Sequence, residues 1–493
     1  MKKLILLTLI LFIYNFSSKS EIYNLDLQKS IEIAKSKSYS MLSLIQDFKI
    51  AEFNLKTATS RLKTHIELNF VAPTYSKQIS TFPTDTSITH YTSKTLNYGG
   101  DLTINQPLPT DGSIYIKSGA SNSDNYSLNK RYPDIFTTIG LKQPLTSLYG
   151  YNEVKSTLKL AELAYEHSKK GLKREELDLN YQVSNVFYNL LAEQKGSEIA
   201  KSNFERQKEA FEISQNKYKA GLIKEVDALQ MEVDLAEAQN NYDLSVVTLG
   251  SALNEFKHLI GINFSDSVSL NSEFKYTVVI VDPVKAVQLA LQNRLEIREQ
   301  EIIIEQNKID IKKEKSAGMI QSSLELSFGL EGLDYPSIQT SISTSFKNSY
   351  SDLLNRSPNY GIGLNIKVPI LDSGENKSRV HAAESTMKQS LLRKEDVQRG
   401  IEREVLDVVA NLNSSLNRLQ LLEKNIVVAE KSFSITRQRY ADGDIDSQSL
   451  ALERTRLNTA YTSHLRAYIS YQLLLTDLMR KTFYDFQKNE LIK

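Results

Sequence analysis

Two long stretches without proline constrain the fold of this chain more than any other feature. Proline is absent between Pro144 and Pro283 and again after Pro369, and proline is the residue that most strongly interrupts a helix. In both stretches mainly apolar residues recur at steps of four and three, the heptad pattern of helices that supercoil around neighbours. A helix from Gly150 to Lys219 would be on the order of 100 Å long. The heptad residues are Val154, Leu158, Ala161, Tyr165, Ser168, Leu172, Leu179, Val183, Val186 and Leu190, and then Ile401, Val405, Val408, Leu412, Ser415, Leu419, Leu422, Ile426, Ala429, Phe433, Thr436 and Tyr440.

Each stretch predicts a hairpin of two long helices. The first hairpin turns at Tyr218–Leu222 and the second at Tyr440–Gly443, so both turns contain a Tyr-x-x-Gly sequence. Glycine suits the left-handed residue that ends a helix, which explains each glycine singly. The duplication of the motif needs a further explanation.

An internal repeat supplies that explanation. A shift of 256 residues places Leu27–Phe70 on Pro283–Leu326 without gaps, and Ala34 falls on Ala290. Asp282 before Pro283 gives the second copy an N-cap residue and a first-turn proline. Because an internal repeat governs the whole fold, each half is predicted to contain helices, strands, a long helix, a turn and a second long helix.

Two β-rich segments lie between the helices, and nine of the ten prolines fall within them. Their strands alternate apolar and polar residues, which is typical both of a membrane β-barrel and of a sheet with one wet face. One chain offers too few strands to close a barrel with a lumen, and an open sheet edge cannot face lipid. Several copies are therefore expected to share one barrel. The clearest apolar sets are Leu324, Leu326, Phe328 and Leu330, then Ile362, Leu364, Ile366 and Val368, and also Ile135, Ile139 and Leu141.

Composition indicates export from the cytosol and excludes several classes of function. Met1-Lys2-Lys3 and the apolar run Leu4–Ile13 predict a secretory signal peptide, with an uncleaved anchor as the alternative. There is no cysteine, so neither disulfides nor a lipidated cysteine can form. The 60 basic and 59 acidic residues are balanced, which gives no electrostatic case for nucleic-acid binding. No later run approaches the roughly 20 apolar residues of a spanning helix.

The two-fold repeat and three motifs together resemble the TolC family of outer-membrane efflux proteins. The motifs are Lys217–Ile223 followed by Asp227, Arg439–Gly443, and the strand-to-helix junction Val368–Gly374. The resemblance implies an α+β membrane protein: a homotrimeric, twelve-stranded transmembrane β-barrel in the outer membrane, continued by a long periplasmic α-helical barrel, with two structural repeats per chain. It implies no enzymatic activity and no cofactor. Its partners would be outer-membrane lipid, a periplasmic adaptor (membrane fusion) protein and an inner-membrane RND or ABC transporter, for which the channel is the passive exit duct.

The resemblance also implies roles for the turns. Adaptors of the family engage the glycine-containing tips, which places docking at Tyr218, Gly221, Leu222 and Gly443. Tyr440 matches a tyrosine that bonds to an acid of the first hairpin and keeps the periplasmic end closed, and Asp227 is the expected acid. A phenol can donate to a carboxylate in this way, although Tyr440 could instead simply pack as the last residue of its heptad series.

The chain departs from the family pattern in two places. Where some members carry two aspartates that ring the constriction, this chain has Ser449 and Leu452. Asp444 and Asp446 offer another acidic pore mouth, although Asp446 also suits the start of a helix. The second departure is an extra β-hairpin, Leu96–Ala120, which could enter the barrel or extend outside it.

Two alternative functions stay open: the outer-membrane component of type I protein secretion, and a structural coiled-coil surface protein. The spacing of Asp442, Asp444, Asp446 and Glu453 imitates a calcium-binding loop, but Ser447 stands where such a loop requires glycine.

The predicted order of segments follows from the repeat. The segments are a signal peptide (1–20), first-repeat N-terminal helices (21–64), a first β-barrel segment with the extra hairpin (65–145), a first long helical hairpin (146–262), a second-repeat linker and helices (263–320), a second β-barrel segment (321–371), a second long helical hairpin (372–485) and a C-terminal tail (486–493).

Overall fold

The computed structural model describes residues 22–84, 87–270 and 276–492. The predicted signal peptide, residues 1–20, lies outside the described residues. The chain separates into two compact units. Of the described residues, the helical unit contains those up to Phe48 together with those of Lys169–Glu299 and Lys394–Lys493, and the sheet unit contains those of Lys49–Ser168 and Gln300–Arg393.

Long helices and long strands account for most of the described residues. The helices are α2 (Leu27–Lys37), α3 (Tyr39–Ser60), α4 (Thr146–Tyr149), α5 (Glu153–Lys219), α6 (Glu225–Ile260), α7 (Pro283–Asn293), α8 (Leu295–Ala317), α9 (Ile342–Asn355), α10 (Glu375–Asp442) and α11 (Ser447–Thr482). The strands are β1 (Ile22–Leu25), β2 (His65–Thr84), β3 (Ser87–Pro107), β4 (Ser113–Asn125), β5 (Lys130–Pro144), β6 (Ser267–Leu270), β7 (Gln321–Leu333), β8 (Asn359–Lys367), β9 (Tyr484–Asp485) and β10 (Glu490–Leu491).

The predicted repeat is confirmed in the secondary structure. Helices α2 and α7 have 11 residues each and begin 256 residues apart, and α6 and α11 have 36 each. The long helices α5 and α10 have 67 and 68 residues. Asp26 and Asp282 cap α2 and α7 by accepting hydrogen bonds from the backbone N–H of Lys29 and Val284. The same local signals therefore start both halves.

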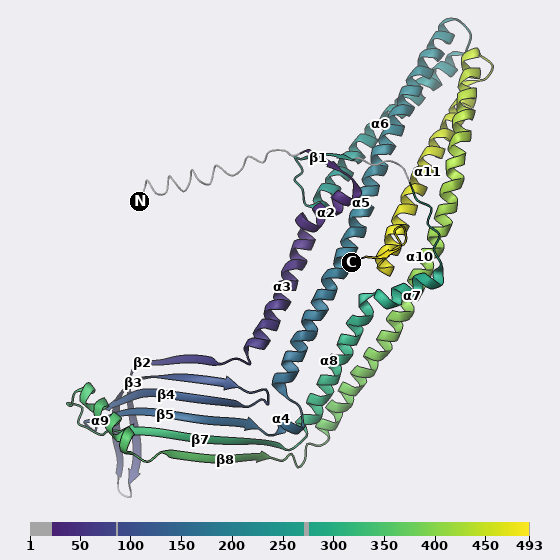
Figure 1. Cartoon of the computed structure of the whole chain (residues 1–493). Coiled ribbons are helices and arrows are strands. Elements are labelled where there is room, and N and C mark those ends of the chain that lie inside the picture. The colour runs from purple at the N-terminus through teal and green to yellow at the C-terminus, as the bar shows by residue number, and fades with distance from the viewer. Residues whose placement is uncertain (1–21, 85–86, 271–275, 493) are drawn as a thin grey trace, which may run out of the picture. The chain divides into compact units, whose positions relative to one another are not determined.

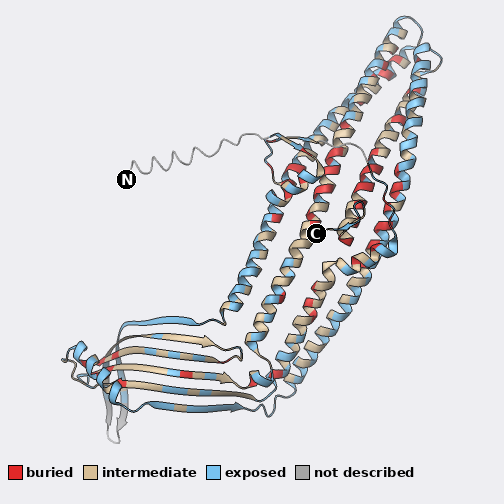
Figure 2. Cartoon of the chain, viewed as in Figure 1, coloured by how far each residue is buried: buried red, intermediate tan, exposed pale blue. Residues whose placement is uncertain are grey.

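The core of the helical unit is built along the heptad series, where the buried residues gather (Figure 2). Ala34 and Ala290, the matched residues of the repeat, are both fully buried. Tyr471 is also fully buried, and its hydroxyl donates to the Thr277 carbonyl at 2.7 Å. At the end of α6, Gly261 has a φ of 76°, and a Cβ there would lie 2.3 Å from the Lys37 carbonyl oxygen. Only glycine fits this position.

The sheet unit contains one six-stranded antiparallel sheet in the order β2-β3-β4-β5-β7-β8 (Figure 1). The extra hairpin consists of β3 and β4, which lie inside this sheet between β2 and β5. Its turn spans residues 108–112. Helix α9 packs against β5 and β7 at one end of the sheet. In the helical unit β1 pairs with β6 in parallel, and β9 pairs with β10.

Candidate functional site at the turns of the long hairpins

The two long hairpins turn with the same backbone geometry. In the first turn the N–H of Gly221 donates to the Tyr218 carbonyl at 2.8 Å, and the N–H of Leu222 donates to the Lys217 carbonyl at 2.9 Å. In the second turn Gly443 donates to Tyr440 at 3.2 Å, and the next N–H donates to the Arg439 carbonyl at 2.9 Å. These pairs of bonds form a Schellman motif, which satisfies carbonyls at the end of a helix. The glycines have φ values of 75° and 88°, as the motif requires.

The predicted docking residues are exposed at these turns. Leu222 is 73% exposed and Tyr218 is 40% exposed. Gly221 and Gly443 are exposed, and a Cβ added to either would meet nothing within 4 Å. The chain itself therefore leaves these positions free to contact another molecule.

The second tyrosine lies in a different environment from the first. Tyr440 is only 4% exposed and belongs to a small core with Ala210, Met231 and Leu450, which come from α5, α6 and α11. Lys217, on the last turn of α5, reaches across to α10. Its Nζ donates to the Tyr440 carbonyl at 2.5 Å and lies 4.5 Å from the centre of the ring. A cation at the carbonyl end of a helix is favourable, as is a cation over an aromatic ring.

The expected hydrogen bond between Tyr440 and Asp227 is not formed. Within the described part of the chain the buried hydroxyls of Tyr440 and Ser214 have no hydrogen-bond partner. Burial raises the pKa of Tyr440, the Ser214 hydroxyl opposes this rise, and the Asp227 carboxylate adds to it. Ser214 and Asp227 are thus close enough to act on the phenol, but neither has the geometry of a hydrogen bond. The ring and the carbonyl of Tyr440 make the contact between the hairpins, and the hydroxyl does not.

The acidic residues after the second turn are placed at the start of α11. Asp446 is its N-cap and accepts a hydrogen bond from the Ser449 N–H at 2.9 Å. The hydrogen bonds from Ser449 lower the pKa of Asp446. Asp444 is exposed in the turn, and Leu452 is 52% exposed on α11. Asp446 therefore has a structural role, and Asp444 is the freer of the two carboxylates.

Further polar contacts join the two hairpins next to the Tyr440 core. Arg437 contacts Glu209 at 2.6 Å, and Arg454 contacts Asp234 at 3.3 Å. A cavity of about 200 Å³ lies among these residues. The sequence does not predict these pairs, because spacing along one helix does not indicate which charge on a distant helix will be its partner. The cavity is lined by Arg206, Gln207, Glu209, Ala210, Ile213, Phe433, Ser434, Arg437, Gln438, Tyr440, Ala441, Leu450 and Arg454.

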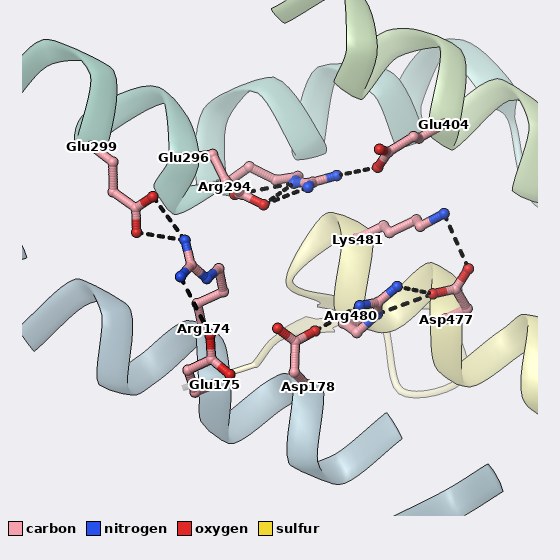
Figure 3. A network of polar contacts seen from close by, with 10 residues as sticks. All are labelled: Arg174, Glu175, Asp178, Arg294, Glu296, Glu299, Glu404, Asp477, Arg480 and Lys481. Carbon is pink, nitrogen blue, oxygen red and sulfur yellow. Dashed lines mark hydrogen bonds and ion pairs between the residues drawn. The ribbon is translucent and has the colours of Figure 1, made fainter. Parts of the chain in front are cut away.

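A second polar network in the helical unit is likewise not predicted by the sequence (Figure 3). Arg294, between α7 and α8, contacts Glu296 and also Glu404 of α10, the latter at 2.8 Å. Arg174 of α5 donates to both carboxylate oxygens of Glu299 at 2.7 and 2.8 Å. Burial alone would raise the pKa of Glu296, but the hydrogen bonds and charge of Arg294 outweigh it and lower the pKa below 4.5. Each cation here has an acidic partner, so the network links α5 to α8 and the start of α8 to α10.

Comparisons with known proteins agree with this architecture. Residues 111–261 and 286–480 match the family model of the outer membrane efflux protein. No curated protein sequence matches the chain. Among the described residues no group of three or more acidic or histidine side chains is placed to hold a metal ion. Nor, in the described part of the chain, does any helix combine the length and apolar character needed to cross a membrane.

Solved structures of low sequence identity share the fold. A membrane protein from Pseudomonas aeruginosa is 17% identical with a TM-score of 0.69, and the match covers 94% of this chain and 91% of that one. The outer membrane channel CmeC of Campylobacter jejuni is 14% identical with a TM-score of 0.68, covering 95% and 86%. The open state of the Neisseria gonorrhoeae MtrE outer membrane channel is 15% identical with a TM-score of 0.66, covering 93% and 89%. The family is one of non-enzymatic channels with a trimeric β-barrel and a long α-helical barrel, and this chain, matched over most of its length, belongs to the outer membrane efflux protein family.

Proposed function

We propose that this chain is the outer-membrane exit duct of a tripartite efflux or secretion system. Three copies form a passive channel that is gated at its periplasmic tip. An inner-membrane RND or ABC transporter drives export through it by way of a periplasmic adaptor. The observation that carries the proposal is the pair of matched turns, one presenting Tyr218, Gly221 and Leu222 and the other Gly443, at the ends of hairpins that touch through Tyr440.

Exposed apolar residues on α6 support assembly of the helices into a ring. Near its start, Val226, Leu229 and Val233 are between 53% and 64% exposed. They recur at steps of three and four, which is the spacing of a helix seam that packs against a neighbouring helix. A second copy of the chain supplies such a neighbour.

The gate in this proposal is the contact between the hairpins. Opening separates the end of α10 from the end of α5, so the Lys217 contact with Tyr440 favours the closed arrangement. Asp227, close to the phenol ring, and Asp444, free in the turn, would then line the parted tips. This is a shift between two packings of the same helices.

A bulky residue at Gly221 tests adaptor docking. Gly221→Trp should abolish ethidium efflux in cells that make the cognate adaptor and pump, while the amount of trimer in the outer membrane stays unchanged. Gly221→Asn is the matched control, because asparagine tolerates the left-handed conformation and adds little bulk. Normal efflux with Gly221→Trp would remove the docking role. If an ABC exporter is the cognate pump, secretion of its polypeptide cargo replaces ethidium efflux as the readout.

A further inference from the structure

The sheet contains more strands than the family resemblance implied. A homotrimeric barrel of twelve strands needs four from each copy, whereas one chain here contributes six to a single sheet. The added strands are β3 and β4. All 13 residues of β4 pair with β3 on one side and with β5 on the other. The extra hairpin is thus part of the continuous ladder.

The register gives all six strands a common apolar face at the end of the sheet that adjoins α5; towards the other end the same face carries the buried ion pair of Asp124 with Arg131. Residues paired across neighbouring strands lie on the same side of a sheet, so the apolar side chains can be followed from β2 to β8. The opposite face is polar and contains cross-strand pairs, including Lys117 with Asp101 at 3.5 Å and Lys142 with Glu325 at 3.0 Å. This is the division expected between lipid and lumen, and β3 and β4 share it. The apolar face consists of Ile66, Leu68 and Phe70 on β2, Leu102 and Ile104 on β3, Ile114 and Ile116 on β4, Ile135, Ile139 and Leu141 on β5, Leu324, Leu326 and Phe328 on β7, and Tyr360, Ile362 and Leu364 on β8.

The turn of the extra hairpin is fastened to the start of the long helix α5. Both carboxylate oxygens of Asp111 accept hydrogen bonds at 2.7 Å, one from the N–H of Glu153 and one from the N–H of Val154. Asn152 donates to the Pro109 carbonyl at 3.0 Å. The first amides of a helix have no partner within the helix, so Asp111 satisfies two of them. If the hairpin lay outside the barrel wall, the first amides of α5 would lose Asp111 as their hydrogen-bond partner.

The sheet has two open edges, β2 and β8. Their apolar side chains are the most exposed on the apolar face: Phe70 is 79% and Ile362 80% exposed, against 40% for Leu102 and 39% for Ile116 on inner strands. Because successive strands alternate in direction and their number is even, β2 and β8 run in opposite directions. The β8 edge of one copy can therefore continue the antiparallel ladder onto the β2 edge of the next.

We propose that three copies close, β8 to β2, into a barrel of eighteen strands, six from each copy. The occupant of each open edge is a second copy of this chain. Barrel diameter grows roughly linearly with strand number, so this barrel is about half as wide again as one of twelve strands, and barrels of 16–18 strands leave an aqueous channel. The barrel is then no obstacle to cargo that has passed the tip. The inference rests on the proposed function for the trimer and goes beyond it in the composition of the wall.

Engineered disulfides test which edges meet. The chain has no cysteine, so introduced cysteines report without background. Leu364→Cys is combined in turn with Ile66→Cys, Leu68→Cys and Phe70→Cys, which scans the register between β8 and β2. At least one combination should give a covalent trimer on a non-reducing gel of outer membranes. The single variants should stay monomeric. The comparator, Leu364→Cys with Ile116→Cys, joins copies only if β4 is an edge strand, so a covalent trimer from it alone would overturn the proposal.

Imaging decides whether β3 and β4 lie in the wall. Electron cryomicroscopy of the full-length trimer in lipid nanodiscs should show eighteen strands in cross-section. A trimer with twelve would refute this inference, and if that trimer still exports ethidium the proposed function stands. A trimer with eighteen strands that does not export ethidium would refute the proposed function and leave this inference standing.

Discussion

The contact of Lys217 with Tyr440 can be removed without altering the core around it. In Lys217→Gln the charge and the reach to the Tyr440 carbonyl are lost, while the ring stays packed against Met231 and Leu450. A hydrogen bond that involves a charged group contributes about 1.5–3 kcal/mol, and a cation that stays in contact with water while it lies over an aromatic ring contributes about 0.5–1 kcal/mol. Since Lys217 is only half-buried, we expect a loss of about 2 kcal/mol per copy, near the low end of the sum.

That loss should appear as a more open tip. Because 1.4 kcal/mol is a factor of ten in an equilibrium constant, about 2 kcal/mol shifts the balance between joined and separated hairpins by about 30-fold. Planar-bilayer recordings of purified trimers should show a higher open probability in the absence of adaptor. Hydrogen exchange of the backbone amides at the end of α10 should also become faster.

Two matched variants make the reasoning refutable. Lys219→Gln removes the same charge two residues further along, where the side chain is exposed, and should leave the open probability unchanged. Tyr440→Phe removes a buried hydroxyl that has no hydrogen-bond partner in the described chain, so it should also be silent. If Lys219→Gln opens the channel as much as Lys217→Gln, the effect is one of net charge. If Tyr440→Phe opens the channel, the phenol hydroxyl has a partner in the trimer, and the contact of Lys217 with the Tyr440 carbonyl is not what keeps the tip closed.

Two further predictions concern the junction and the polar network. Asp111→Ala should destabilise the start of α5 by about 1 kcal/mol, the usual effect of losing a helix cap, and hydrogen exchange at the amides of Glu153 and Val154 should become faster. Asp111→Asn keeps one acceptor, so its exchange rates should lie between those of the wild type and of Asp111→Ala. Unchanged exchange in Asp111→Ala would show that the cap is dispensable. The pKa of Glu296 is lower in the folded chain than its ordinary 4.5, so its stabilising contribution is complete above that pH and is lost as the pH falls through the folded pKa. The midpoint temperature of thermal unfolding, followed by circular dichroism, should therefore decrease as the pH is lowered below about 4.5. Glu296→Gln should have a lower midpoint temperature at pH 7 and a shallower decrease with falling pH. An equally steep decrease in this variant would assign the acid sensitivity to other carboxylates.

Features encoded locally could be predicted from the sequence. Proline-free heptads predicted α5 and α10, Tyr-x-x-Gly predicted both turns, and alternation predicted the faces of β7 and β8, because each signal depends only on neighbours along the chain. The partner of Lys217 lies 223 residues away, and no local pattern specifies it. Whether the extra hairpin lies inside or outside the sheet depends on which strands it pairs with. The pairing of β4 with β5 is not specified by the local sequence, and only the structure shows it.

The family resemblance singled out Tyr440, which does contact the other hairpin, but through a different bond from the one expected. It matched Tyr440 with a tyrosine that donates to an acid, whereas in this chain the contact is made by the ring and the backbone carbonyl. The reason lies in the repeat. Tyr218 and Tyr440 occupy the same position in two identical turns, yet one is 40% exposed and the other 4%. Duplication reproduces backbone geometry, which local sequence determines, but it cannot reproduce surroundings, because each hairpin has the other as its neighbour. The exposed Tyr218 is then available to an external partner, and the buried Tyr440 is available to hold the two hairpins together. In the proposed function, one turn motif used twice thus supplies both a docking contact and a closing contact at the tip.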